Sequence, residues 1–446
     1  MSRFWIVPAF VVGLAAHNLV MSLLYGAGVR GRPLTVIEAW KELLLAGALA
    51  WYGVVAARAR RLPFRPNVAD ALALAFAAVV CVYAVVPQHV LGGAATTSGI
   101  VHGVRHHLLF VAAYVLGRCL GPLPRRTSWW FFGTGAAVAA FGLVEEYAVS
   151  LDRWRHSGAK GWFSDQLGFG YRGLSGLPEN FVYNLGNDRI VRRLVSTFLG
   201  PLATAHMLCV VILLAVAWRH RWAWPLAAVA FAGLLFTYSR STWIALLVGL
   251  LVLAAAQRSV VPLTTAAGVV AVCALFVVAF PHVAPAAQFT PSELSFQHEH
   301  AKGGTNEQSV ANDASTRSHW RNLREGLERV ARHPQGYGVG NSGSTATRFG
   351  AEPKAGESTY TELGVDTGVV GLALFVAFAV ALLRRLRHRS TWLLASLAAV
   401  FTLAVQTDVL GVPWLVFCVW LAAGAESGIL ESSRISRIGR TPAPSR

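Results

Sequence analysis

The sequence predicts an all-α integral membrane protein, and three observations support this fold class. Of the 446 residues, 54% are hydrophobic and only 14% are charged, whereas soluble globular proteins average about 25% charged residues. The apolar residues form blocks of about 18–24 residues, long enough to cross a hydrocarbon core about 30 Å thick. Basic residues lie in the short segments between these blocks, so the net charge of +17 indicates membrane topology rather than binding to nucleic acid.

About twelve membrane spans can be placed along the chain. The expected spans are 4–25, 34–57, 69–87, 104–121, 128–150, 194–218, 222–238, 240–257, 262–280, 366–383, 391–409 and 411–430. The first block is longer than the apolar region of about 7–15 residues in a cleaved signal peptide, so we interpret it as a span. The chain then divides into spans one to five (1–150), a first outward loop (151–193), spans six to nine (194–280), a large outward loop (281–365), spans ten to twelve (366–430) and a basic tail (431–446).

The basic residues also predict the orientation of the chain. A short basic segment follows every even-numbered span, for example Arg125 and Arg126 after span four and Arg384 and Arg385 after span ten. Positively charged loops stay on the cytoplasmic side of a membrane. We therefore expect both termini in the cytoplasm and both long loops on the outer face of the membrane.

Both long loops are expected to be ordered, and long ordered loops are often functional. The first contains several aromatic residues among glycines, which either form the core of the loop or stack on sugar rings; they include Trp154, Trp162, Phe163 and Tyr171. In the second, apolar residues at spacings of 3, 4 and 3 predict a helix that ends at Pro334 and Gly336. These residues are Trp320, Leu323, Leu327 and Val330.

Outward-facing arginines are the strongest candidate site. Arg192 and Arg193 precede span six, Arg240 lies in the short turn between spans seven and eight, and Arg317 and Arg321 share a face of the predicted loop helix. An arginine in so short a turn is expected to be paired or to bind an anion, although snorkelling to lipid headgroups is an alternative. Several guanidinium groups together suit a pyrophosphate, because each binds phosphate oxygens through two hydrogen bonds.

A carboxylate stands just before span ten, in the segment Glu357-Ser358-Thr359-Tyr360. Glu357 and Tyr360 share a face if this segment is helical. A carboxylate near arginines at a membrane surface is either a general base or the counter-ion of those arginines, and the residues alone leave both interpretations open. Glu145 and Glu146, at the end of span five, are expected to pair with Arg153 or Arg155.

Two other patterns are weaker signals. The run from Gly336 to Gly340 lacks the preceding strand and the Gly-Lys-Ser/Thr of a phosphate-binding loop, so it predicts a tight backbone path instead. His102, His106 and His107 have helical spacing but no acidic partner nearby in the sequence. The five cysteines lie in or beside apolar blocks without metal-type spacing. We therefore expect no metal site.

Several short motifs, taken in order, resemble the O-antigen ligase/polymerase family. They cover about 190–375, and the order of the set is more specific than any one motif. The motifs are Arg193-Leu194 with Thr197-Phe198, Pro201 and Ala203; Ser239-Arg240-Ser241; Arg317 and Trp320 followed by His333-Pro334-Gln335-Gly336-Tyr337-Gly338-Val339-Gly340; Ser358-Thr359-Tyr360; and Gly364, Gly368 and Gly371.

The resemblance implies transfer of a glycan from a polyprenyl-pyrophosphate carrier to an acceptor hydroxyl, with inversion and without a metal or another cofactor. The acceptor would be lipid A core, another carrier-linked glycan or a protein side chain. Arg193 and Arg240 match the arginines that hold the donor pyrophosphate, and Arg317 matches the arginine of the loop helix. Further substrate contacts are expected from Arg192, Arg321, Tyr360, Ser239 and Ser358.

One departure from the family pattern concerns the proposed base. The ligases carry a His-Asn pair where this chain has Glu357-Ser358. Glu357 is therefore expected to accept the proton of the acceptor hydroxyl, kept ionised by the arginines, and a polysaccharide polymerase becomes at least as plausible as a ligase. The alternatives are a flippase for the same lipid-linked sugar and a non-catalytic assembly or sensor protein.

Overall fold

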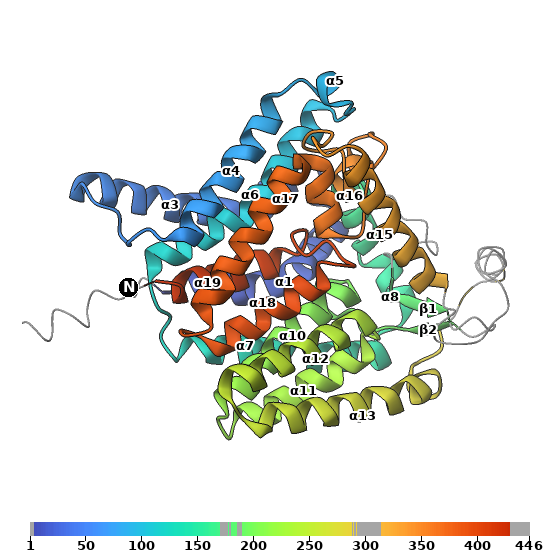
Figure 1. The fold of residues 1–446 in the computed structure, drawn as a ribbon. Coiled ribbons are helices and arrows are strands. Elements are labelled where there is room, and N and C mark those ends of the chain that lie inside the picture. Colours follow the sequence, from blue (N-terminus) through green and yellow to red (C-terminus); the bar gives the residue numbers. More distant parts are fainter. Residues whose placement is uncertain are drawn as a thin grey trace, which may run out of the picture.

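The computed structural model describes residues 4–169, 177, 180–184, 190–287, 289, 291 and 314–428, with the backbone alone for 314–318. Tyr171, the tail 431–446 and the side chain of Arg317 lie outside the described part. Within it, almost all regular structure is helical (Figure 1). This confirms the all-α fold class.

Nine helices are long and apolar enough to cross a membrane, counted over the residues that the structure describes. They are α1 (Ile6–Gly26), α3 (Trp40–Ala59), α4 (Val68–Val85), α6 (Thr97–Leu120), α7 (Thr127–Ala148), α10 (Pro201–Trp218), α12 (Arg240–Gln257), α13 (Val260–Val283) and α17 (Thr359–Leu386). Three shorter apolar helical segments occupy the places of the other expected spans: α11 (Ala223–Phe236), α18 (Thr391–Leu403) and η4 with α19 (Leu415–Val419 and Trp420–Glu426). The chain is a multi-pass membrane protein.

The remaining elements are short, apart from one loop helix. They are α2 (Arg32–Glu38), α5 (Gln88–Leu91), α8 (Leu151–His156), α9 (Ala159–Gly161), η1 (Trp162–Gln166), β1 (Val182–Asn184), β2 (Ile190–Arg192), η2 (Ser196–Phe198), α15 (Ala314–Arg332) and α16 (Gly343–Arg348). The two strands pair antiparallel, with Val182 opposite Arg192. The helix α15 confirms the one predicted from the apolar spacing in the large loop.

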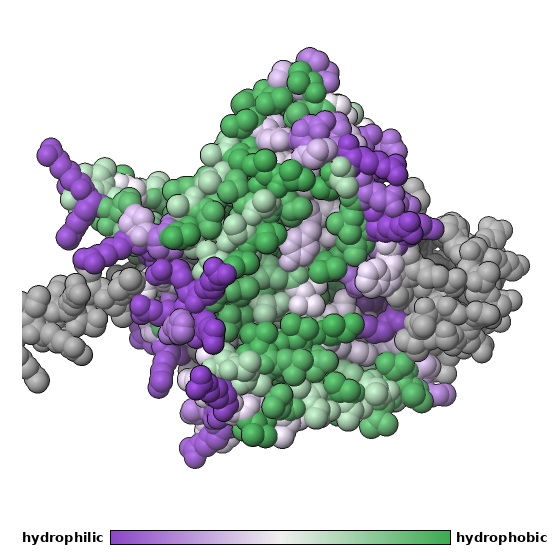
Figure 2. All heavy atoms as spheres, in the orientation of Figure 1, coloured by the Kyte–Doolittle hydropathy of each residue, from purple (hydrophilic) through white to green (hydrophobic). Residues whose placement is uncertain are grey.

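Successive crossings divide the connections between two faces of the molecule. The short connections after α3, α6, α10, α12 and α17 carry arginines, and we call their side the basic face. The strands, α8, α15 and α16 belong to connections on the opposite face. Figure 2 shows hydrophilic side chains at two ends of the molecule with a hydrophobic band between them, which is the surface expected of a membrane-embedded bundle.

The centre of the bundle is α10. In its most apolar window 78% of the residues are buried, against 6% in α3, and α10 contacts α7, α11, α12 and α18. A helix that is apolar on every side is stable only in a protein core or in lipid. We infer that α10 uses its apolar surface for packing, whereas α3 presents its surface to the bilayer.

A buried ion pair joins α4 to α6. Asp70 lies in the first turn of α4 and completes a capping box with Asn67. Its carboxylate also accepts hydrogen bonds from Arg118 Nε at 2.8 Å and from the Tyr114 hydroxyl at 2.7 Å. Both charged side chains are almost fully buried, so each needs the other to offset its desolvation.

Several expected spans begin at different residues in the structure, and the helix of span four, for example, begins at Thr97 rather than 104. The helix of span six starts at Pro201 rather than 194, because 194–200 forms an irregular segment that contains η2, and proline at the first helical position favours that start. The helix of span ten starts at Thr359 rather than 366 and is kinked at Gly368. The candidate residues Arg193 and Glu357 therefore lie just before the membrane helices α10 and α17, in segments whose backbone is not helical.

Candidate functional site

Arg193 is held in a buried position beside the two strands. Its backbone N–H donates to Phe181, and the next residue, Leu194, donates to Phe236 at the end of α11. The side chain is only 9% exposed and its Nε donates to the carbonyl of Thr237 at 2.9 Å. No carboxylate pairs with Arg193 among the described residues, so its buried charge is uncompensated, which is costly unless an anion binds there.

Arg240 starts α12 from the turn that follows α11. Its Nη2 lies 3.3 Å from the Tyr183 hydroxyl, and its guanidinium carbon lies 5.9 and 5.8 Å from the ring centres of Tyr183 and Tyr238. Tyr238 adopts a left-handed backbone conformation with φ of 48°, which is uncommon for a residue other than glycine and is found at functional sites. The turn thus aims a cation between two aromatic rings.

The two arginines act on one another. Burial lowers the pKa of Arg193 to about 10, with a smaller contribution from the positive charge of Arg240, so the two side chains are close enough for their charges to interact. Arg193 nevertheless stays charged at neutral pH. Buried Arg193 and half-buried Arg240 repel each other, and an anion with two phosphate groups would bind favourably to both. The structure thus brings together the two arginines that the motifs selected.

Arg192 points into a different environment. Its Nη2 lies 2.7 Å from Glu145 Oε1, where the carboxylate is fully buried, and it also bonds the carbonyl of Val149. Trp154 donates to the same Glu145 oxygen at 2.6 Å. The expected pairing of Glu145 with Arg153 or Arg155 is wrong, because Glu145 bonds Arg192. We conclude that Arg192 fastens β2 to α7 rather than contacting substrate.

The remaining candidates of this group differ in accessibility. Ser239 is buried, and its hydroxyl lies 2.8 Å from Thr242 Oγ1, which shapes the start of α12. Arg321 is exposed on α15 and is open to a ligand. The side chain of Arg317 lies outside the described part of the chain, so its role stays a prediction.

The segment before α17 is tied to the connection that follows α18. Ser358 is buried and its hydroxyl donates to the carbonyl of Ala404 at 3.2 Å, while Thr359 N–H donates to the same carbonyl. The Tyr360 hydroxyl donates to Phe401 at 3.0 Å. Ser358 and Tyr360 were expected to contact substrate, but these bonds indicate that they position the segment instead.

Glu357 contacts a histidine that the sequence did not single out. Its Oε2 lies 2.6 Å from Nδ1 of His319 on α15, and the two side chains are 45% and 39% exposed. The hydrogen bond from His319 lowers the pKa of Glu357, and a hydrogen bond from Asn322 acts in the same direction. No ion pair joins Glu357 to Arg193 or Arg240 in the described structure. The carboxyl is kept ionised by His319, not by the arginines.

Glycines on both helices allow α15 and α17 to pack closely. A Cβ on Gly326 would lie 2.8 Å from Thr361, and a Cβ on Gly364 would lie 2.7 Å from Val330, so only glycine permits this approach. His319 and Asn322 share that face with Gly326 by helical spacing. Trp320 and Leu327 are 58% and 52% exposed, so the apolar residues that predicted the helix do not all form its buried side.

Two histidines of α6 each contact a carboxylate that is distant in the sequence. His106 Nε2 lies 3.2 Å from Asp408, and His107 Nε2 lies 2.8 Å from Asp366. The ligand atoms of His106, Glu362 and Asp408 all lie within 4.8 Å of one another, so these three side chains could hold a metal ion. Each imidazole has one carboxylate partner, whereas Nδ1 of His107 is buried without a hydrogen-bond partner in the described structure.

The glycine run after α15 confirms the tight backbone path. Gly336, Gly338 and Gly340 all have positive φ, a region that favours glycine. Asp366 on α17 accepts hydrogen bonds from the backbone N–H groups of Gly340 and Asn341, both at 3.1 Å. The run therefore follows the surface of α17, and the backbone N–H groups of Gly336, Tyr337 and Gly340 donate to groups of the protein.

The described aromatic residues of the first loop are packed. Trp162 is fully buried against Met21, Tyr25 and Leu34, and Phe163 packs on the same group. Trp154 is 4% exposed. Core packing, rather than stacking on sugar rings, is the role that the structure gives them.

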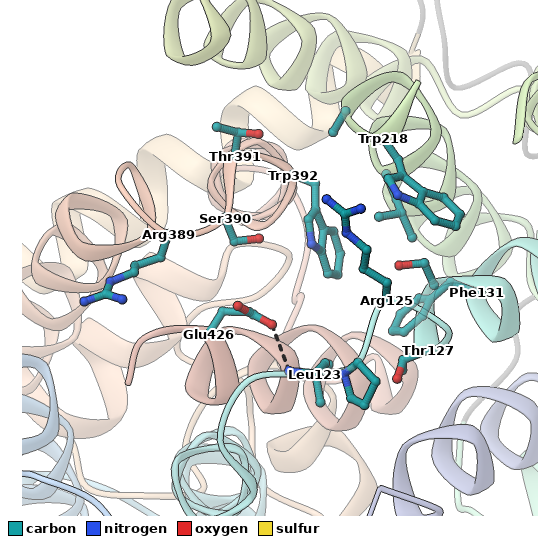
Figure 3. A pocket seen from close by; sticks show the side chains of 14 residues that line it. Leu123, Arg125, Thr127, Phe131, Trp218, Arg389, Ser390, Thr391, Trp392 and Glu426 are labelled. Atoms are coloured by element: carbon teal, nitrogen blue, oxygen red, sulfur yellow. Dashed lines mark hydrogen bonds between the residues drawn. The ribbon is translucent and has the colours of Figure 1, made fainter. Parts of the chain in front are cut away.

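A cavity of about 330 Å³ opens at the other end of the bundle. It lies on the basic face, between the starts of α7 and α18, the ends of α10 and α19 and the connections after α6 and α17. Figure 3 shows Arg125, Arg389, Trp218 and Trp392 around it. Glu426 Oε1 accepts a hydrogen bond from the Leu123 backbone at 2.9 Å there. This cavity is separated by the membrane-spanning part from Arg193, Arg240 and Glu357.

Part of the chain matches a known protein family. The sequence model of the family described as O-antigen ligase matches residues 225–376. The matched segment contains Arg240, His319 and Glu357, while Arg193 precedes it. A search of curated proteins finds no match. The family match confirms the resemblance that the motifs predict and supports a ligase- or polymerase-type function in general.

Proposed function

We propose that the protein transfers a glycan from a polyprenyl-pyrophosphate carrier to an acceptor hydroxyl, as an O-antigen ligase or a polysaccharide polymerase. The reaction would invert the anomeric carbon and need no metal. One observation carries the proposal: Arg193 is buried near Arg240 and pairs with no carboxylate in the part of the chain that the structure describes, and Arg240 lies in the segment that matches the family.

The arginine pair fits the donor side of this reaction. When the glycan leaves its carrier, negative charge grows on the pyrophosphate oxygens, and fixed cations that face this charge lower the barrier. Arg193 and Arg240 meet that requirement because their backbone is anchored to β1, β2 and the turn after α11. Tyr183 beside Arg240 offers a further hydroxyl group toward a phosphate.

The acceptor would bind near the start of α17, beside Glu357. The helix α12 crosses the membrane, α13 returns, and α17 then begins on the face where α12 began. Glu357 and Arg240 are therefore on one side of the bilayer. By the positive-inside rule this is the outer side, which agrees with cytoplasmic termini in the bacterial inner membrane. The partners would be the lipid-linked donor, lipid A core or another hydroxyl acceptor, and membrane lipids.

A reconstituted assay in lipid tests the proposal. The purified protein receives a polyprenyl-pyrophosphate oligosaccharide with and without lipid A core, and the products are sized by gel and mass. Multiples of the repeat unit without added acceptor identify a polymerase, whereas a single transfer that needs lipid A core identifies a ligase. Donor that only reaches the opposite leaflet would overturn the proposal in favour of a flippase.

Two variants at opposite ends of one helix provide the control. Arg240 begins α12 and Arg258 follows its last residue on the basic face. We expect R240Q to abolish product while R258Q keeps wild-type activity, because only the first position faces the donor. Full activity of R240Q would contradict the pyrophosphate assignment.

A further inference from the structure

The carboxylate at the start of α17 does not stand alone, because α15 brings an imidazole to it. His319 Nδ1 and Glu357 Oε2 are 2.6 Å apart although 38 residues separate them in the chain. Both side chains remain partly exposed, so a substrate from outside can reach the pair. This is the arrangement of a base and the group that orients it.

Three features hold the pair in place. Close packing at Gly326 and Gly364 fixes α15 against α17. Asn322, three residues after His319 on α15, also lies close enough to the Glu357 carboxylate to lower its pKa. Glu357 itself has a left-handed backbone with φ of 67°, a conformation that is strained for glutamate and clusters at functional sites. The backbone therefore aims the carboxylate at α15 at some cost in stability.

We propose that His319 is the general base of the transfer and that Glu357 is the positioning residue that orients it. This inference rests on the proposed function and refines its acceptor side. When Nδ1–H donates to the carboxylate, the lone pair of the imidazole is on Nε2. The ordinary pKa of histidine is about 6.5 and that of glutamate about 4.3, so the imidazole is the stronger base of the two near neutral pH.

The proposed transfer is a single displacement at the anomeric carbon of the donor. Nε2 of His319 takes the proton of the acceptor hydroxyl, and the acceptor oxygen forms a bond to the anomeric carbon of the donor. The bond from that carbon to the pyrophosphate oxygen breaks, and its electron pair leaves with the pyrophosphate. Glu357 stabilises the imidazolium that forms, while Arg193 and Arg240 face the charge on the leaving group.

Other charged groups near the pair set its electrostatic environment. Glu362, one turn into α17, has its carboxyl near Glu357, Asp366 and Asp408. His106 pairs with Asp408, and Asn322 is the polar neighbour on α15. On α15 itself, Arg321 and Arg324 follow His319, so the carboxylate of Glu357 is the printed contact that favours the protonated imidazole after the proton is taken up.

The test compares variants of both residues in the reconstituted transfer assay, with folding checked by thermal stability and donor binding. H319Q should lower kcat about 10²–10⁴-fold, the usual loss when a general base is removed, and leave the KM for the donor nearly unchanged. E357Q should keep part of the activity and move the acid limb of the kcat profile to lower pH, because the negative charge beside the imidazole is gone. His388 is an exposed histidine on the basic face and provides the control. We expect H388Q to keep the wild-type kcat and pH profile.

Two rescue experiments exclude a purely structural role. Added imidazole should restore part of the activity of H319A. The double variant E357H/H319Q should be more active than H319Q, because it places an imidazole directly at the start of α17. Wild-type kcat in H319Q, with activity lost at every pH in E357Q, would overturn the proposal and make Glu357 the base. Absence of transfer by the wild-type protein would instead contradict the proposed function itself.

Discussion

Arg192 and Arg193 are neighbours in the chain but have opposite environments. Arg192 lies 2.7 Å from the buried carboxylate of Glu145, whereas Arg193 bonds a backbone carbonyl and has no carboxylate partner in the described structure. Adjacent residues of an extended segment point to opposite sides. One arginine therefore anchors the strand, and the other is left to bind a ligand.

Substitutions at these two positions should have different effects. R192M leaves Glu145 buried without its partner, so we expect a loss of about 3–5 kcal/mol in stability, measured as a lower Tm in detergent. R193Q removes an uncompensated buried charge, so its Tm should be unchanged or higher while transfer is lost. Equal destabilisation by both variants would contradict the division of roles.

The ion pair between α4 and α6 should be needed for stability but not for chemistry. D70N removes the charge that Arg118 requires in a buried position, and we expect a loss of about 3–5 kcal/mol. The folded fraction of D70N should transfer glycan at the wild-type rate, because Asp70 lies next to the basic face, on the opposite side of the membrane from Arg193, Arg240 and Glu357. The measurement is thermal unfolding together with activity per folded molecule. A lower rate in the folded fraction would link this pair to catalysis.

Gly368 should not tolerate a side chain. Its φ is 64° inside α17, and a Cβ would lie 2.7 Å from the carbonyl oxygen of Pro334. The left-handed backbone alone lowers the stability of an alanine variant by about 1–2 kcal/mol. The close contact with Pro334 lowers it further. We expect G368A to lower both Tm and activity, whereas G268A on the lipid-exposed α13, where a Cβ meets no atom within 4 Å, should behave as wild type.

Donor binding should be insensitive to pH around neutrality. Burial lowers the pKa of Arg193 to about 10, so the unfavourable effect of burying this cation is present below pH 10 and disappears as the pH rises above it. The guanidinium keeps its charge from pH 6 to 9, and the Kd of the donor should be constant over that range and rise near pH 10. A change in Kd between pH 6 and 8 would show that a histidine supplies the charge.

Much of the fold and part of the site could be predicted from local patterns. Apolar blocks marked the membrane helices, and spacing marked α15. The motifs pointed to Arg193 and Arg240, which are neighbours in the structure. Glycines 336, 338 and 340 marked a tight path because their conformation is encoded locally.

What could not be predicted depends on contacts between distant segments. His319 meets Glu357 across 38 residues, Arg192 meets Glu145 across 47, and His107 meets Asp366 across 259. Each partner is chosen by helix packing, which a single sequence does not reveal. The glycines at 326 and 364 were the available signal for the first pair, since they mark the close approach of α15 to α17.

The most direct test of the central claim is the affinity for the donor lipid. Wild-type protein, R193Q, R240Q and the control R258Q would be titrated with a polyprenyl-pyrophosphate-linked glycan and with the corresponding monophosphate. We predict that R193Q and R240Q each bind the pyrophosphate donor about 30-fold more weakly, or about 2 kcal/mol, that R258Q binds as wild type, and that the loss is smaller for the monophosphate. Unchanged affinity of both R193Q and R240Q would contradict the account.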